Sequence, residues 1–317
     1  MKHLTLPEKL RPGDRVALTA PSSPVPSDKL DDAVRSIEYL GLEPVVLESC
    51  HLSRGYMAGP DEIRAENINR AFRDSSIKAV FCLRGGFGAS RLLPLLDLAA
   101  IRENPKLFVG YSDITALHTV FNRLCGFITF HGPMPNTDYT SMDDFTFSRL
   151  RSLLFEDPPL VRAENPEGED MTVLSEGRCS GLLTGGNLSL LAGTLGSPYE
   201  IDTKGRILFI EEVDEEPYRI DRYLTALSLA GKFRDCEGVI LGTFAGCESS
   251  SADSLSIRDI ASDVILAWGK PVLENLRSGH IYPQLTLPMG AETHMDLREN
   301  RAVLEFILHD GSQANPF

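Results

Sequence analysis

The sequence predicts an α/β protein of two domains: an N-terminal domain built on a parallel sheet, then a smaller, β-rich C-terminal α/β domain. The chain has 317 residues, which is enough for two domains of about 150 residues each. Its first half alternates short β-rich runs with amphipathic helical stretches, and a proline- and acid-rich stretch at 156–176 interrupts this pattern. We therefore expect an N-terminal domain at 1–155, a linker at 156–176 and a C-terminal domain at 177–317.

The first domain contains apolar runs typical of buried strands, at residues 15–20, 44–47, 77–83, 107–110 and 127–130. Helical segments are expected between them, at residues 30–40, 63–72, 89–96 and 114–124. In the first of these, apolar side chains recur from Leu30 to Leu40 at the spacing of a helix face. Asp61 is positioned to cap the second. Strands that alternate with helices of this length indicate βαβ units and a parallel sheet.

The second domain has its own strands and helices. Strands are expected at residues 206–210, 238–243, 271–274, 284–287 and 302–307, and helices near 217–230 and 256–268. The first of these helices has Pro217 at its first position and Gly231 just beyond its end, as the usual preferences at helix termini predict.

The composition of the chain argues against two classes of partner. The net charge is −14, and a protein this acidic repels nucleic-acid phosphates and anionic membrane surfaces. We therefore expect neither nucleic acid nor a membrane as a partner. The N-terminus lacks the apolar segment of a signal peptide, and no apolar run approaches the roughly 18 residues of a membrane helix. These features predict a cytoplasmic protein.

The cysteines and histidines predict no metal site and no cofactor. The six cysteines include no CxxC pair, and the seven histidines include no HExxH pair. Six cysteines in a chain of this length are also too sparse for a disulfide framework. We interpret them as buried thiols in a reducing compartment.

The first candidate for a functional motif is a glycine turn, RGGFG at 84–88, directly after an expected strand. Glycines at such a turn allow the backbone to present N–H groups to a ligand. The turn is not a P-loop, because no Gly-Lys-Ser/Thr follows, and Arg91 stands where GxGxxG requires its third glycine. It is therefore either a tight structural turn or a set of N–H donors for an oxyanion or carboxylate.

The second candidate is Gly-Tyr-Ser-Asp at 110–113, between an expected strand and an expected helix. A serine at this junction lies beside the N–H groups of a helix N-terminus, as in a nucleophile elbow. The usual hydrolase pattern also has a glycine two residues after the serine, which this chain lacks. The alternative is that Ser112 or Asp113 merely caps the helix.

The third candidate combines a run of acids with a distant histidine. Glu211 and Glu212 follow the apolar run ILFI, and three more acids precede Pro217. Acids before a helix favour its dipole, which explains the later ones, but a carboxylate at the end of a buried strand needs another reason. His280 lies in an Arg-Ser-Gly-His loop segment, and a lone histidine in a loop is usually a surface residue.

Taken together, the motifs RGGFGASRLL, GYSD, GGNLSLL, ILFIEE, EPYRIDR, SGH and LPMGA, in this order, resemble the LD-carboxypeptidase family of serine peptidases, the muramoyltetrapeptide carboxypeptidases. The resemblance covers nearly the whole chain, from residue 16 to residue 292. It implies an active site at the domain interface, with a serine from the first domain and a glutamate and a histidine from the second. It also implies a homodimer.

Matched residue by residue, the resemblance places the nucleophile at Ser112, the acid at Glu211 and the general base at His280. It places the oxyanion hole at the backbone N–H groups of Gly86 and Asp113. The family commonly has Glu-Asp after the strand, whereas this chain has Glu-Glu, so Glu212 remains a second candidate acid. Because side chains alternate along a strand, only one of the two glutamates can readily face the site.

The resemblance implies a serine carboxypeptidase that releases the terminal D-alanine of murein tetrapeptide during peptidoglycan recycling. One alternative is a hydrolase of microcin C-type peptidyl-nucleotides that confers antibiotic immunity. Another is a non-catalytic module whose glycine turn binds a small anion. Catalysis requires Ser112, Glu211 and His280 to act together, whereas anion binding does not.

Overall fold

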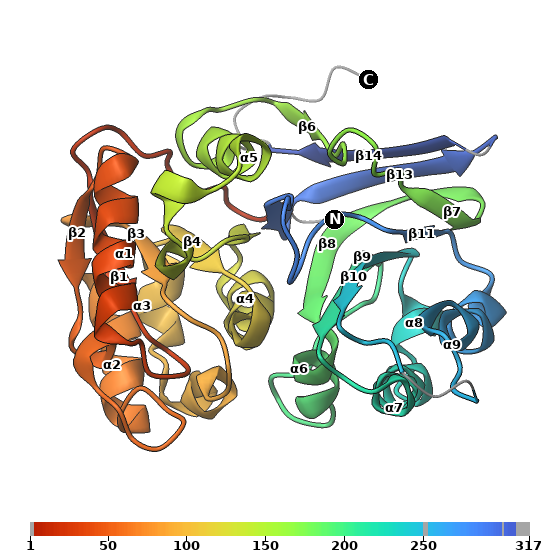
Figure 1. Ribbon diagram of the computed structural model, residues 1–317, viewed down its shortest axis with the longest axis horizontal. Coiled ribbons are helices and arrows are strands. Elements are labelled where there is room, and N and C mark those ends of the chain that lie inside the picture. Colours follow the sequence, from red (N-terminus) through yellow and green to blue (C-terminus); the bar gives the residue numbers. More distant parts are fainter. Residues whose placement is uncertain (1–2, 250–252, 300, 309–317) are drawn as a thin grey trace. The chain divides into compact units, whose positions relative to one another are not determined.

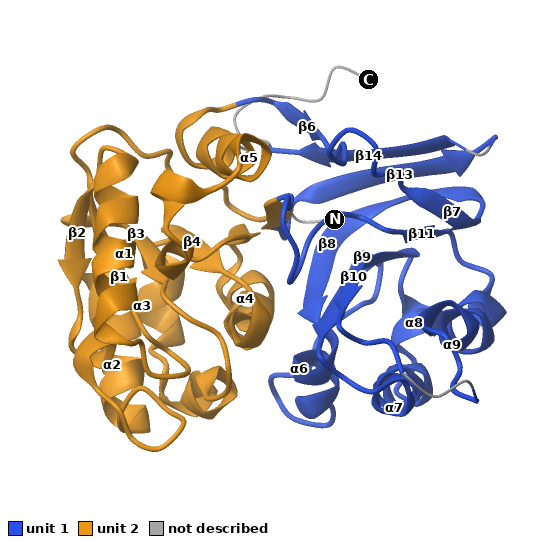
Figure 2. Ribbon diagram, in the orientation of Figure 1, with its two compact units in different colours: residues 1–3, 158–285, 289–308 blue, residues 4–157, 286–288, 309–317 orange. Residues whose placement is uncertain are grey.

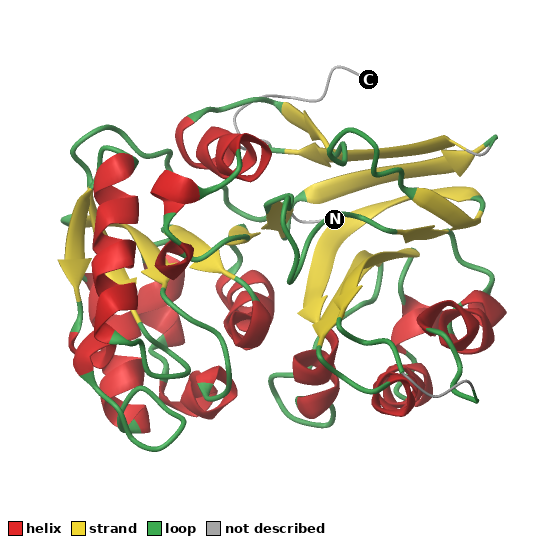
Figure 3. Ribbon diagram, viewed as in Figure 1, coloured by secondary structure: helices red, strands yellow, loops and turns green. Residues whose placement is uncertain are grey.

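The computed structural model describes residues 3–249, 253–299 and 301–308. They form two compact units, coloured separately in Figure 2. Unit 2 contains residues 4–157 and 286–288, and unit 1 contains His3 and the described parts of 158–285 and 289–308. Each unit combines helices with a β-sheet (Figure 3), so the predicted α/β class is confirmed. Within the described ranges, no helix is both long and apolar enough to cross a membrane.

Unit 2 is built on a sheet with the strand order β12-β5-β4-β3-β1-β2. Its strands are β1 (Arg15–Thr19), β2 (Glu43–Val46), β3 (Ile77–Cys82), β4 (Leu107–Gly110), β5 (Thr129–His131) and β12 (Leu287–Met289). The pairings β1–β2, β1–β3, β3–β4 and β4–β5 are parallel, as predicted. All four residues of β4 are buried, which explains its continuous apolar sequence.

Helices flank this sheet, with α1 on its near side and α3 on its far side in Figure 1. The α-helices of unit 2 are α1 (Ser27–Tyr39), α2 (Asp61–Arg73), α3 (Leu98–Glu103), α4 (Thr115–Val120) and α5 (Asp144–Phe155). The helix predicted at 89–96 is a 3-10 helix at Ala89–Leu95 that contains Pro94. Proline cannot donate the backbone hydrogen bond that an α-helix needs. The helix predicted at 114–124 ends as a π-helical turn at Phe121–Cys125.

Asp61 does not cap α2 as predicted. Pro60 occupies the capping position, and Asp61 is the first residue of the helix. Its carboxylate instead binds the guanidinium groups of Arg64 and Arg91. The negative charge nevertheless lies in the first turn of the helix, where the helix dipole favours it.

Unit 1 is built on a larger, mixed sheet with the order β6-β14-β13-β8-β9-β10-β11-β7. Its strands are β6 (Leu160–Arg162), β7 (Thr172–Ser175), β8 (Gly177–Asn187), β9 (Arg206–Val213), β10 (Gly238–Ala245), β11 (Val272–Glu274), β13 (Glu292–Arg298) and β14 (Arg301–Ile307). The central strands β8, β9, β10 and β11 pair in parallel. The outer pairings β8–β13, β13–β14, β14–β6 and β11–β7 are antiparallel.

The stretch predicted as a linker, 156–176, contains two of these strands. β6 pairs with β14 and β7 pairs with β11, so both edges of the sheet come from this stretch. Edge strands are short and carry charges and prolines beside them, which conceals them from a search for apolar runs. The search also missed β8, which contains four glycines, because glycine has a low strand propensity.

The helices of unit 1 lie together along one side of its sheet (Figure 1). They are α6 (Leu188–Gly193), α7 (Pro217–Leu229), α8 (Lys232–Asp235) and α9 (Ile257–Val264). Leu208 and Ile210 of β9 pack in one buried cluster with Ile220 and Leu224 of α7. This packing fixes the direction of the β9 side chains, so Glu212 points toward the helices and Glu211 toward the opposite face.

Candidate active site

Ser112 lies in a sharp turn at the carboxyl end of β4, half-buried and with a positive φ of 64°. Few residues other than glycine adopt this conformation, because Cβ crowds the backbone. A 3-10 turn at Ser112–Ile114 follows and leads into α4. The arrangement is that of a nucleophile elbow. The capping alternative is not observed, because no side-chain hydrogen bond caps either helical segment.

The glycine turn that follows β3 packs directly against this serine. A Cβ atom at Gly85 would lie 2.7 Å from Ser112 Oγ, so only glycine fits there. Gly86 has a φ of 108°, and a Cβ at this position would collide with the Ser23 hydroxyl. The Asp113 N–H belongs to the first turn of its helical segment, where N–H groups have no acceptor within the helix. Unit 2 thus brings Ser112, Gly86 and Asp113 together.

The Asp113 side chain has a role that sequence reasoning missed. It is fully buried, and Oδ2 accepts hydrogen bonds from Ser22 Oγ at 2.5 Å and from Ala89 N at 2.7 Å. Burial raises the pKa of Asp113, although these hydrogen bonds favour its charged form. One carboxylate therefore joins the turn after β1, the glycine turn and the serine turn.

Arg64 also connects these loops, through hydrogen bonds to their backbone. Its guanidinium is fully buried and donates to the carbonyl oxygens of Pro21 and Gly88, and it also binds Asp61. No sequence motif marked Arg64, because arginines in amphipathic helices are usually exposed. Glycine allows the backbone of these turns to adopt its conformation, and the charged hydrogen bonds from Arg64 hold it there.

Glu211 and His280 form a second group of candidate residues, within unit 1. Glu211 Oε2 accepts a hydrogen bond from His280 Nδ1 at 2.7 Å, and the glutamate is fully buried. Because the carboxylate holds the proton on Nδ1, Nε2 is the ring nitrogen that can accept another. Burial opposes charge on His280, but the hydrogen bond and the charge of Glu211 outweigh it, so its pKa lies above 6.5.

The neighbouring Glu212 has a different set of partners. Its carboxylate accepts hydrogen bonds from Asn187 Nδ2 at 2.7 Å, Ser189 N at 2.8 Å and Val213 N at 3.0 Å. Both oxygens are thereby satisfied. In contrast, Glu211 Oε1 is buried with no hydrogen-bond partner among the described residues. A buried carboxylate that is only partly satisfied is costly to stability, which points to a functional reason for Glu211.

The loop that carries His280 is fastened to β10. Ser278 O accepts hydrogen bonds from Thr243 N and Thr243 Oγ1, both at 3.2 Å. Gly279 has a φ of 121°, and a Cβ there would lie 2.8 Å from Glu211 Oε2. The pairing of β9 with β10 shifts register at this level, between Leu241 and Phe244. Such bulges bend a strand and redirect side chains.

Strand β9 continues beyond the predicted boundary. It runs to Val213, so Glu211 lies within the strand and not at its end. Phe244 and Ala245 of β10 pair with Glu212 and Val213. The backbone hydrogen bonds between β9 and β10 therefore continue past the two glutamates, whose carboxylates have buried hydrogen-bond partners.

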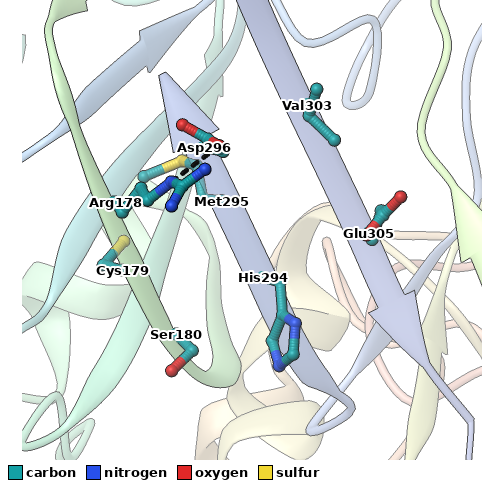
Figure 4. A pocket seen from close by; sticks show the side chains of 8 residues that line it. All are labelled: Arg178, Cys179, Ser180, His294, Met295, Asp296, Val303 and Glu305. Carbon is teal, nitrogen blue, oxygen red and sulfur yellow. Dashed lines mark hydrogen bonds and ion pairs between the residues drawn. The ribbon is translucent and has the colours of Figure 1, made fainter. Parts of the chain in front are cut away.

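A cavity elsewhere in unit 1 offers no comparable chemistry. It has a volume of about 470 Å³ and is lined by side chains of β8, β13 and β14, shown in Figure 4. Arg178 pairs with Asp296 there, and His294 pairs with Glu292. Burial raises the pKa of the Cys179 thiol to about 12, which keeps it protonated and unreactive.

All six cysteines are free thiols. Among the residues that the structure describes, no cluster of three or more His, Cys, Asp or Glu side chains could hold a metal ion.

Comparison with known proteins gives consistent results at the level of sequence families. Residues 16–132 match the family described as LD-carboxypeptidase N-terminal domain. Residues 180–295 match the LD-carboxypeptidase C-terminal domain. A probable murein peptide carboxypeptidase of Bacillus subtilis strain 168 is 41% identical over 308 residues, covering 96% of each chain.

Solved structures share the fold. The muramoyltetrapeptide carboxypeptidase from Oxalobacter formigenes superposes with a TM-score of 0.82 at 29% identity, covering 93% of this chain and 99% of that one. The microcin C7 self-immunity protein MccF superposes with a TM-score of 0.88 at 24% identity, covering 97% and 99%. At that identity the likeness to MccF concerns the fold alone.

Proposed function

The chain belongs to the LD-carboxypeptidase family, and from this premise we propose that it is a serine carboxypeptidase acting on murein tetrapeptide. It cleaves the bond between an L-centre and the terminal D-alanine. The hydrogen bond between Glu211 Oε2 and His280 Nδ1, 2.7 Å long, is the observation that carries the proposal. A buried carboxylate that orients a histidine is the arrangement a serine nucleophile needs for its general base.

In the proposed mechanism, Ser112 Oγ attacks the scissile carbonyl carbon while His280 Nε2 takes the hydroxyl proton. The N–H groups of Gly86 and Asp113 stabilise the oxyanion, each by roughly 3–4 kcal/mol. Collapse breaks the C–N bond, and His280 gives its proton to the departing amine of D-alanine. A water molecule, deprotonated by His280, then attacks the serine ester, and the proton returns to Ser112 as the acid product leaves. Glu211 stabilises the imidazolium throughout.

The names of relatives support the substrate class. The Bacillus subtilis relative is named for murein peptide and the Oxalobacter formigenes structure for muramoyltetrapeptide. The MccF structures motivate the second candidate, hydrolysis of microcin-type peptidyl-nucleotides, on the fold alone. The sequence of this chain is more similar to the murein enzymes than to MccF, so we favour murein peptide as the substrate.

The test is a substrate panel read by product mass. The protein is incubated with L,D-tetrapeptide, disaccharide tetrapeptide and an aminoacyl-sulfamoyl adenosine. We expect release of D-alanine from the first two. The same peptide ending in L-alanine is the control and should remain essentially uncut, because a misplaced terminal residue costs about a hundredfold in rate. Equal cleavage of both diastereomers contradicts the LD specificity, and cleavage of the nucleotide alone supports the second candidate.

The cellular setting and assembly are further parts of the proposal. We propose that the enzyme acts in the cytoplasm, in peptidoglycan recycling, and that it forms a homodimer, as the family resemblance implies. Light scattering coupled to gel filtration measures the assembly directly. A mass near that of one 34.9 kDa chain contradicts the homodimer without affecting the proposed chemistry.

A further inference from the structure

Arg84 lies at the turn that the proposed mechanism uses as an oxyanion hole, and the mechanism gives it no role. It directly precedes Gly85, the residue that packs against Ser112 Oγ. Its side chain is exposed, and its Nη1 donates to the carbonyl oxygen of Pro24 at 3.0 Å. No carboxylate among the described residues forms an ion pair with it.

The contact with Pro24 places the guanidinium beside the oxyanion hole. Pro24 follows Ser23, whose N–H donates to Gly85 O at 3.2 Å and whose hydroxyl packs against Gly86. The loop that holds the Arg84 head group is therefore the loop that borders the Gly86 N–H. Hydrogen bonds from Arg64 to Pro21 and from Ser22 to Asp113 hold this loop against the neighbouring turns.

Other arginines near the turn already form ion pairs. Arg64 is fully buried and binds Asp61, and Arg91 binds the same carboxylate at 2.6 Å. Among the described residues, Arg84 is an exposed arginine of this turn that forms no ion pair and can bind an anion from solution. Its planar fork suits a carboxylate, which it can bind through two parallel hydrogen bonds.

A carboxypeptidase must recognise the free carboxylate at the end of its substrate. The inference rests on the proposed function, in which the substrate ends one residue beyond the scissile bond. Neighbouring residues are about 3.8 Å apart, so the terminal carboxylate lies within about 4 Å of the scissile carbonyl carbon. A group that binds this carboxylate must therefore lie next to the oxyanion donors. We propose that Arg84 binds the free carboxylate of the terminal D-residue and so restricts cleavage to the end of the peptide.

The experiment compares an L,D-peptide ending in a free carboxylate with the same peptide ending in a carboxamide. In the wild-type protein we expect kcat/KM to favour the acid by about 10- to 100-fold, as for a hydrogen-bonded charge pair. Arg84→Met should raise KM for the acid and bring the acid-to-amide ratio close to one, because the acid loses more than the amide. Arg84→Lys keeps the positive charge but cannot form two parallel hydrogen bonds to a carboxylate, so its acid-to-amide ratio should lie between those of the wild type and Arg84→Met.

Arg73→Met is the matched control, since Arg73 is an exposed arginine of the same unit that pairs with surface acids. It should leave the ratio unchanged. If Arg84→Met retains the wild-type ratio, the inference is wrong while the proposed function stands. If the wild-type protein cleaves neither peptide, the proposed function itself fails. If Arg84→Met does not fold, the ratio for Arg84→Lys decides in the same way.

Discussion

The two groups of candidate catalytic residues, one in each unit, are built on different physical principles. In unit 2, Ser112 is held in a strained backbone conformation, and the buried charged side chains of Asp113 and Arg64 join the turns around it. In unit 1, Gly279 provides the positive φ, and the essential feature is one buried hydrogen bond between Glu211 and His280. The proposed nucleophile therefore depends mainly on backbone shape, whereas the proposed base depends mainly on charge.

The largest effect is expected from the nucleophile itself. Ser112→Ala should lower kcat by at least about 10⁴-fold, as removal of a triad member does. Alanine keeps a Cβ, so the strain at φ 64° is retained, and thermal unfolding should be nearly unchanged. Steady-state kinetics and a melting curve check both points. Activity above about a tenth of wild type, a difference of only about 1.4 kcal/mol, excludes Ser112 as the nucleophile.

The same variant, combined with a change at His280, tests whether the two groups of residues act as one site. Groups that act in one step are strongly non-additive. The double variant Ser112→Ala/His280→Ala should therefore be no slower than the slower of the two single variants. If the losses in kcat multiply instead, Ser112 and His280 act independently, and the proposed triad is wrong.

The second prediction separates the adjacent glutamates. Glu211→Gln should lower kcat by about 10⁴-fold, because an amide favours the wrong imidazole tautomer. It should also shift the acidic limb of the kcat/KM profile to lower pH, since Glu211 is what raises the pKa of His280 above 6.5. The pH profile of the variant measures this shift directly.

Glu212→Gln is the matched control. Glu212 accepts three hydrogen bonds, and an amide cannot accept all of them. The variant should lose about 1–3 kcal/mol of unfolding free energy while kcat falls by less than about tenfold. A larger loss of kcat in Glu212→Gln than in Glu211→Gln would reverse the assignment of the acid.

The sequence identified candidate residues where short motifs mark their chemistry. Gly86 and Ser112 stand in glycine and strand–helix turns, and the family resemblance supplied Glu211 and His280. The sequence alone could not predict the contacts that hold these turns in place, because those contacts join residues that are far apart in the chain. Ser22 and Asp113, which share a hydrogen bond, are 91 residues apart. Burial of an arginine such as Arg64 is likewise a property of packing and not of a pattern.

The fold was predictable to a similar degree. Strands such as β3 and β4 are buried and therefore read as apolar runs. The edge strands β6 and β7 were missed because half-exposed edges need no apolar run. The extension of β9 through Glu211 and Glu212 was missed because acids in strands are rare, and their partners lie on other elements.

The third prediction tests the support of the nucleophile. Asp113→Asn keeps the size of the side chain but removes the negative charge that strengthens the hydrogen bonds from Ser22 and Ala89. We expect a loss of kcat of about 10- to 100-fold with little change in KM. Ser22→Ala removes only one donor and should have a smaller effect in the same direction. If both variants change stability alone, Asp113 is structural and does not position Ser112.

The fourth prediction concerns acid stability and His118 of α4. This histidine is buried behind the serine turn, where Nε2 donates to Gly110 O and Nδ1 accepts from Thr129 Oγ1, both at 2.8 Å. Burial lowers its pKa from 6.5 to about 4. The unfolded chain therefore binds the proton more readily, and stability falls as the pH falls from 6.5 toward 4.

Between about pH 7 and about pH 5 this group should remove roughly 2 kcal/mol of unfolding free energy. Urea unfolding at both pH values measures the loss. His118→Asn, which does not titrate, should lose that much less over the same range. An identical loss in the variant would show that other groups cause the acid sensitivity.

The smallest expected effect is the opposite pH dependence of His280. Its pKa in the folded protein is raised above 6.5, because the hydrogen bond and charge of Glu211 outweigh burial. The folded state therefore binds the proton more readily than the unfolded chain. This contribution is fully present below pH 6.5 and is lost as the pH rises through the folded pKa. Urea unfolding of His280→Asn should accordingly show a shallower loss of stability on the alkaline side than the wild type, whereas His118→Asn changes only the acidic side. If His280→Asn flattens the acidic side instead, burial dominates at both histidines, and the contrast between a base tuned by charge and a nucleophile held by packing fails.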